Sequence, residues 1–238
     1  MVIAATPFEG FRPESIQFLA DLAEHNDREW FTPRKADYER LIKGPFEALI
    51  GALAAALAAR DVPLHADPKR SMFRIYRDTR FSRDKSPYKT HVGASFPWME
   101  MTAAGYEVTD GAAHGNGGYF NFQPGEMYVG GGMWMPEKAR LDAFRRAVVE
   151  NPDRVRAALE EPGFVAAFGS VTAHEYLKRL PPGLPADHPM ADLFRYKDVV
   201  FGRRLSDEEV LSSALPDTLA DAYAAGMPVF RLLDTVRA

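Results

Sequence analysis

The sequence predicts an α+β fold, in which helices at both ends of the chain pack around a central, mostly antiparallel sheet. Apolar residues recur with a helical period before residue 60, the period changes to two residues between 71 and 133, and helical spacing returns after Pro136. We expect one domain over residues 1–238, helical over 1–60, with the sheet and a basic loop over 61–135, and helical again over 136–238.

The composition is that of an ordinary globular protein. Hydrophobic residues make up 46% and charged residues 26%, and 238 residues suffice to bury a sizeable core. The absence of cysteine excludes thiol nucleophiles, disulfides, iron–sulfur clusters and cysteine-ligated zinc. The longest uncharged apolar run, residues 48–59, is too short to span a bilayer, and the first ten residues lack a signal-peptide pattern. We therefore expect a soluble, cytoplasmic protein with no membrane partner.

The first sixty residues predict a series of helices. Apolar side chains recur at helical spacing behind Pro13, and Asn26–Asp27 interrupts this first helix. Thr32–Pro33 is the expected cap and first turn of the second helix. Gly44–Pro45 is expected to break or kink that helix before the alanine-rich stretch 46–59.

Alternation of apolar and polar residues predicts four strands in the middle of the chain: Met72–Arg77, His91–Phe96, Tyr119–Gln123 and Met127–Met133. The last two flank the turn pair Pro124–Gly125 and predict a hairpin. A further short strand is expected around Tyr106–Val108, inside a segment rich in glycine and alanine.

The last third of the chain predicts helices. Pro136 opens one that ends at Asn151, and Pro152 begins another through Leu159. Ser206, with Glu209 three residues later, is the signature of a capping box on a short helix.

Residues 69–91, called the basic segment below, have an unusual charge. They contain eight lysines and arginines against Asp78 and Asp84, a net charge of +6 in a chain whose total is −4. Like charges repel unless an anion compensates them, so the segment predicts a phosphate or carboxylate ligand bound by arginine forks and lysines. The structural alternative is that acids inside the segment or elsewhere in the chain pair with these cations.

The same segment carries a family resemblance. Phe73–Ser82 followed by Asp84–His91 resembles the hallmark of the bacterial family catalogued as domain of unknown function 2461. Asn26–Phe31, Gly130–Trp134 with Pro136, and Asp187–Pro189 match further pieces of its pattern, so the resemblance covers nearly the whole chain. It supports the domain boundaries, and it implies no activity, because the family has none that transfers.

Strand parity predicts two different faces of the sheet. One set of alternating positions is apolar and should face the helices: Phe73, Ile75, Val92, Ala94, Phe96, Phe120, Phe122, Met127 and Val129. The other set is aromatic, polar or glycine: Arg74, Tyr76, His91, Gly93, Ser95, Tyr119, Asn121, Gln123, Tyr128, Gly130, Gly132 and Trp134. Aromatic walls with a few polar groups are typical of a small-molecule pocket. An ordinary solvent-exposed face, or a second core under the C-terminal helices, is the alternative.

Motifs do not identify a reaction. The chain lacks a P-loop, a dinucleotide-binding glycine pattern, a serine-nucleophile elbow and the common histidine metal motifs, so no cofactor is indicated and no metal site is expected. His91 and Tyr88 are the candidates to move a proton, and the sequence does not decide between an enzyme and a binding protein.

The expected function is the binding of a small anionic ligand, carboxylated or phosphorylated, by the basic segment and the polar sheet face. The candidate ligand-binding residues are Arg74, Tyr76, Arg77, Arg80, Lys85, Tyr88, Lys89, His91, Tyr119, Asn121 and Trp134. A nucleic-acid-binding module is one alternative, because Phe73, Tyr76, Phe81 and Tyr88 interleave with the cations. A protein-interaction domain without catalysis is the other.

Overall fold

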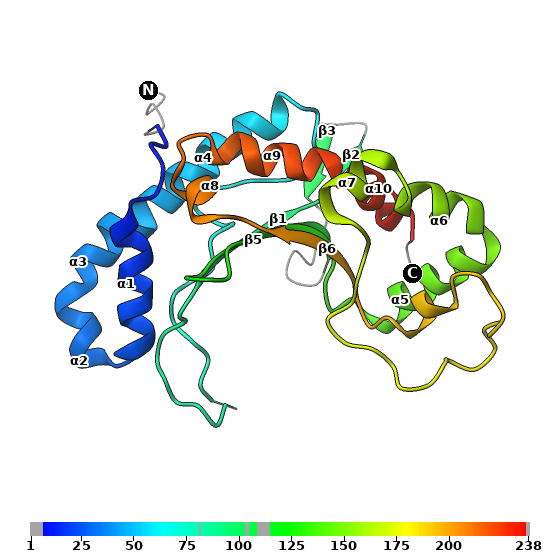
Figure 1. The fold of residues 1–238 in the computed structure, drawn as a ribbon, viewed down its shortest axis with the longest axis horizontal. Helices are drawn as coiled ribbons and strands as arrows, with labels where there is room; N and C mark the ends of the chain where they lie inside the picture. Colours follow the sequence, from blue (N-terminus) through cyan, green and yellow to red (C-terminus); the bar gives the residue numbers. More distant parts are fainter. Residues whose placement is uncertain (1–6, 81, 103–104, 109–114, 237–238) are drawn as a thin grey trace.

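The computed structural model contains an open, four-stranded antiparallel sheet with the strand order β1-β4-β5-β6 (Figure 1). The structure describes residues 7–80, 82–102, 105–108 and 115–236. The strands of this sheet are β1 (Val92–Pro97), β4 (Asn116–Phe122), β5 (Tyr128–Met133) and β6 (Val199–Arg204). A separate pair, β2 (Met99–Thr102) and β3 (Gly105–Val108), forms a two-stranded sheet. The α+β prediction is confirmed.

The predicted hairpin is present as β4 and β5, with Gly125 in its turn at φ +77°. The prediction of helices throughout the last third of the chain is wrong at β6, which pairs with β5 and places Gly202 opposite Gly130. The apolar run Val199–Phe201 carries this strand, but it is short and far from the other strands in sequence. Pairing with a distant neighbour decides its conformation.

Met72–Arg77 was predicted as a regular strand, and this is wrong. The segment makes two isolated bridges instead, from Met72 to Ala94 and from Tyr76 to Tyr88. It therefore changes partner along its length, first pairing with β1 and then with the returning end of the basic segment. Because its partner changes between the two bridges, strict alternation of its side chains is not maintained through the whole segment.

The first part of the chain is helical, as predicted, with different boundaries. It contains α1 (Pro13–Glu24), α2 (Arg28–Phe31), α3 (Lys35–Tyr38) and α4 (Gly44–Ala58), the last three joined by a 3₁₀ turn and a π-helical turn. Asp27, not Thr32, caps α2, because its carboxylate accepts a hydrogen bond from the Trp30 amide at 2.8 Å. Gly44–Pro45 does not break the helix, which passes through the π-helical turn Glu39–Lys43 immediately before it.

The resulting helical run, Arg28–Ala58, is long and apolar enough to cross a membrane by length and composition. The sequence analysis considered only the apolar stretch 48–59 and therefore underestimated the length of this helical run. In the structure, however, the apolar face of α4 is almost completely buried in the core, and α4 packs along α9. This is the burial expected of a core helix in a soluble α+β domain.

Helices cover one face of the sheet. The second half contains α5 (Lys138–Glu150), α6 (Pro152–Leu159), α7 (Pro162–Phe168), α8 (Asp207–Leu211), α9 (Leu215–Ala225) and α10 (Met227–Thr235). The capping box predicted at Ser206 and Glu209 is present, with both of its hydrogen bonds, at the start of α8. In Figure 1, α4 and α9 lie along the upper side of the sheet, and β4 and β5 contact α10. The opposite side lies between the basic segment and the loop that precedes β6, and we call it the open face.

Candidate functional site

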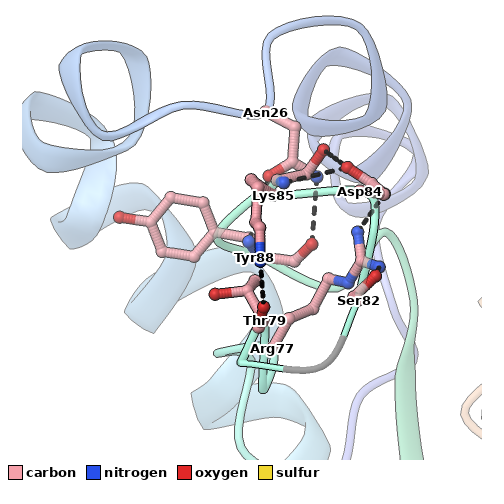
Figure 2. Close-up of polar contacts among 8 residues, drawn as sticks. Asn26, Arg77, Thr79, Ser82, Asp84, Lys85 and Tyr88 are labelled. Atoms are coloured by element: carbon pink, nitrogen blue, oxygen red, sulfur yellow. Dashed lines mark hydrogen bonds and ion pairs between the residues drawn. The ribbon is translucent and has the colours of Figure 1, made fainter.

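The basic segment uses part of its charge in contacts with itself (Figure 2). Arg77 forms an ion pair with Asp84, which also accepts hydrogen bonds from Ser86. The hydrogen bonds from Ser86 and then from Arg77 hold the pKa of the Asp84 carboxyl well below its usual value. Arg80 pairs with Asp78 at 2.6 Å and lowers the pKa of that carboxyl to about 2. These two arginines have the acid partners that the structural alternative required.

Two further candidate residues are held by other contacts within the chain. The Lys85 ammonium donates a hydrogen bond to the Thr79 carbonyl at 2.8 Å (Figure 2). Tyr88 is buried and stacks on Phe31, with 4.1 Å between the ring centroids, and burial raises the pKa of its hydroxyl. Tyr76 is 51% exposed, and its ring centroid lies 5.6 Å from that of Tyr88. The structure places none of these three side chains in the cavity described below.

Three basic groups of the segment lie together and form no ion pair within the described residues, although the charge of Arg74, after the hydrogen bonds of Arg80, helps to lower the pKa of Asp78. The Lys89 ammonium lies 5.3 Å from the centroid of the Phe73 ring. Burial, and then the charge of Arg74, lower the pKa of Lys89. Burial, and then the charge of Lys89, lower the pKa of His91. Within the part of the chain that the structure describes, Arg74, Lys89 and His91 make no side-chain hydrogen bond or ion pair. An external anion would relieve the mutual repulsion of these three groups.

Phe73 is on the opposite face from the one predicted. We expected it among the apolar positions that face the helices. The strand residues of that apolar set are buried, as predicted. The Phe73 amide donates to the Gly93 carbonyl, and its ring centroid lies 6.4 Å from that of Tyr119, on the open face. The Met72–Ala94 bridge explains the difference, because it places Met72 on the face of Ala94 and therefore Phe73, the next residue, on the opposite face with Gly93.

Tyrosine rings lie flat on glycines of the open face. A Cβ atom on Gly93 would lie 3.0 Å from the Tyr119 hydroxyl, and one on Gly202 would overlap the Tyr128 ring. Tyr119 donates a hydrogen bond to the Asn121 side chain at 3.1 Å, and Asn121 in turn donates to a backbone carbonyl of the hairpin turn. Asn121 therefore orients Tyr119. Burial raises the pKa of both tyrosine hydroxyls.

A cavity of about 580 Å³ occupies this face. Of the predicted ligand-binding residues, Tyr119 and Trp134 line it. Its other lining side chains include Phe73, Ser95, Tyr128, Val200, Thr172 and His174, and none of the described residues that line it is acidic. Arg74, Lys89 and His91 are not part of the lining; Lys89 and Arg74 lie beside its Phe73 end, through the contacts given above.

The far wall of the cavity comes from a segment that the sequence analysis did not connect with the sheet. Thr172 pairs with Val200 along the outer edge of β6. The His174 amide donates to the carboxylate of Asp198 at 2.7 Å, and the His174 ring centroid lies 5.0 Å from that of Trp134. Asp198 is 3% exposed, and burial raises its pKa. The sequence analysis did not recognise β6. Once this strand is known, residues 172–174, which lie along its outer edge, become candidates for the cavity wall.

The described residues hold no group of three histidine, aspartate or glutamate side chains arranged to bind a metal ion. What the geometry provides is an aromatic cavity with a few hydroxyls, one imidazole at its far wall, and unpaired positive charge beside the opposite end. This combination is suited to binding an anion that also has an apolar part.

The chain matches a known protein family over most of its length. Residues 14–231 match the family described as "Conserved hypothetical protein (DUF2461)". The chain belongs to this family. No curated protein matches it, and no solved structure matches it either. The match confirms the resemblance drawn from the hallmark segment.

The structure shows how the hallmark segment of this DUF2461 chain is arranged. In this chain, its acids and two of its arginines stabilise the segment itself, and its last residues bring Lys89 and His91 to the edge of the open face. The Gly130–Trp134 part of the DUF2461 pattern supplies β5 and the Trp134 wall of the cavity.

Proposed function

We propose that this protein binds a small anionic ligand in the cavity of the open face, with the anionic group directed to Lys89, Arg74 and His91. One observation carries the proposal: a cavity whose described lining residues include no acid lies beside three basic groups that form no ion pair within the described residues, although Arg74 lies close enough to Asp78 to help lower its pKa. An anion bound there would form charge-assisted hydrogen bonds, each worth about 1.5–3 kcal/mol. The volume of about 580 Å³ falls in the usual range of small-molecule sites.

The nucleic-acid alternative has less support. It needed four aromatic side chains that stack with bases between free cations. Tyr88 is buried against Phe31, Phe81 lies outside the described residues, and Arg77 and Arg80 are paired with acids of their own segment. Tyr76 is the exposed aromatic residue that remains. A protein partner of acidic surface is the third possibility, and it becomes the favoured one if no small anion binds.

Thermal unfolding at low salt tests the proposal, with a panel of inorganic phosphate, sugar phosphates, nucleotides, dicarboxylates and short oligonucleotides. A ligand at about 100 times its dissociation constant stabilises the folded state by about 2.7 kcal/mol. At about 2–4 °C per kcal/mol, this gives a clear rise in Tm for a chain of this size.

The decisive comparison is between two lysine variants. Lys89→Ala should abolish the rise in Tm, while Lys35→Ala, an equal change of charge at an exposed position of α3, should leave it unchanged. A panel without any stabilising anion, or an equal response of the two variants, would contradict the proposal. A bacterial, cytoplasmic setting is part of this proposal, and cell fractionation tests it.

A further inference from the structure

At one place the cavity is lined by glycines, so that backbone atoms form its surface without covering side chains. Gly117 of β4 pairs with Gly132 of β5, and Gly118 pairs with Gly131, and the cavity is lined by all four. A Cβ atom on Gly117 would lie 2.6 Å from the Phe96 carbonyl oxygen, and Gly132 has φ +119°. These contacts leave no room for a side chain at either position. A planar group can therefore lie directly on the backbone here, and we call these four residues the glycine floor.

An aromatic side chain stands beside this floor without being buried. Trp134 is two residues beyond Gly132, lines the cavity, and is 41% exposed. The next residue, Met135, has φ +42°, a conformation that costs a non-glycine residue about 1–3 kcal/mol. The chain thus bends unfavourably where it presents the indole, and backbone strain of this kind concentrates at functional sites.

The glycine floor and the basic groups are at different places along the strands. Gly93, which contacts Phe73, lies opposite Asn121, whereas Gly117 lies four residues earlier in β4. At about 3.4 Å per residue, this is a separation of roughly 14 Å. A single compact anion such as phosphate cannot reach both.

We infer that the ligand is an elongated anion with a planar aromatic ring, its ring on the glycine floor against Trp134 and its anionic group near Lys89. The inference rests on the proposed function, and it adds the class of molecule. A ring and a terminal anion joined by a spacer on the order of 10 Å would occupy both regions at once. Nucleoside triphosphates have this form and serve as probes.

Tryptophan fluorescence and isothermal titration test the inference with three probes: a nucleoside triphosphate, the corresponding monophosphate, and inorganic tripolyphosphate, which has the charge without the ring. We expect the triphosphate to bind at least about tenfold more tightly than tripolyphosphate, as one stacked base contributes. We expect the monophosphate also to bind more weakly, because it cannot span both regions. Binding should change the emission of Trp134.

Variants separate the two levels of the proposal. Trp134→Ala should remove the advantage of the triphosphate and leave tripolyphosphate affinity unchanged, whereas Lys89→Ala should weaken both. Trp134→Phe keeps a ring at the position and should retain most of the advantage, and Trp30→Phe on α2 is the matched control. Equal affinities for triphosphate and tripolyphosphate, both dependent on Lys89, would overturn the inference and leave the proposed function standing. Binding of no probe, with no effect of Lys89→Ala, would overturn both.

Discussion

Asn26 and Tyr88, 62 residues apart, are joined by two hydrogen bonds between one side chain and one backbone unit (Figure 2). The Asn26 amide accepts from the Tyr88 N–H and donates to the Tyr88 carbonyl, each at 3.0 Å. The Asn26 carboxamide thus pairs with both the N–H and the C=O of Tyr88, as the backbone of a neighbouring strand would. The contact fixes the end of the basic segment to the N-terminal helices, and so it positions Lys89, the next residue.

We predict that Asn26→Ala destabilises the protein by about 1–3 kcal/mol, because it leaves two backbone groups unpaired. At about 2–4 °C per kcal/mol, differential scanning calorimetry will detect the fall in Tm. Asn26→Asp keeps the hydrogen-bond acceptor and loses the donor, so its free energy of unfolding should lie between those of the wild type and Asn26→Ala. Asn151→Ala is the control, since Asn151 is exposed and its side chain caps no helix. Equal stability of Asn26→Ala and the wild type would show that the contact contributes nothing.

The alternation of residues predicted the central sheet well in the strands that form a regular ladder with a neighbour. The apolar positions of β1, β4 and β5 are buried, and the polar positions Tyr119 and Trp134 line a cavity, because side chains in these strands alternate strictly. Phe73 was assigned to the wrong face because the Met72–Ala94 bridge sets its orientation, and no local pattern records that pairing.

Features set by distant contacts could not be predicted from the sequence. β6 and the wall at Thr172–His174 form by pairing across long separations, and short apolar runs do not reveal that. The charge count identified the basic segment but not which cations are paired, because the choice between Arg77 and Lys89 depends on loop geometry. The sequence placed Gly93 on the polar face but did not indicate what covers it, and the structure shows tyrosine rings over Gly93 and Gly202.

Asp84 is expected to hold the basic segment in its folded form. Asp84→Asn removes the ion pair with Arg77, so the segment should be cleaved several-fold faster by trypsin, which cuts after its lysines and arginines. Asp78→Asn is the matched control, since the Asp78 pair joins residues only two apart and closes no large loop. Similar cleavage rates for both variants would contradict this role.

Acid should have the same effect as the Asp84 substitution. The pKa of Asp84 in the folded protein lies below its ordinary value of 3.8, so its stabilising contacts are fully present above pH 3.8. They are lost as the pH falls through the lower, folded-state pKa. Acid-active proteolysis with pepsin should therefore show protection of the segment decreasing in this window, and Asp84→Asn should remove that pH dependence.

His91 should make both stability and anion binding depend on pH below 6.5. Burial and the charge of Lys89 lower its pKa in the folded protein below 6.5, so the unfolded chain binds the proton more readily. Stability should fall as the pH is lowered below 6.5, and His91→Asn should flatten this part of the profile in urea unfolding. His25→Asn, at the end of α1, controls for loss of a histidine elsewhere.

Anion affinity should change in the opposite direction. A bound anion favours the protonated imidazole, so an anion whose own charge is constant over the range, such as sulfate, should bind more tightly as the pH falls from 8 to 5.5, and a bound anion should raise the pKa of His91. Titration of the His91 ring by NMR, with and without tripolyphosphate, measures this directly. A pKa of His91 that the anion does not change would place the anion elsewhere.

The glycine under Tyr119 provides a test of the open face that needs no ligand. A Cβ atom on Gly93 would lie 3.0 Å from the Tyr119 hydroxyl and 3.2 Å from the Phe73 ring, so Gly93→Ala displaces these rings and should cost about 1–3 kcal/mol. In a Tyr119→Ala background the main obstacle is gone. In that background Gly93→Ala should be nearly neutral. Alanine lowers the conformational entropy of the unfolded chain, and this offsets the remaining cost of the added Cβ atom.

A double-mutant cycle in urea measures this coupling, expected at about 0.5–3 kcal/mol for residues in contact. Gly51→Ala in α4 is the contrasting control: its Cβ would have ordinary contact at 3.8 Å with Pro68, and alanine is the better helix former, so the substitution should stabilise. Additive effects of Gly93→Ala and Tyr119→Ala would mean that the tyrosine ring does not rest on Gly93 in solution. The wall of the proposed binding cavity would then lie elsewhere, because the position of Tyr119 depends on that absent side chain.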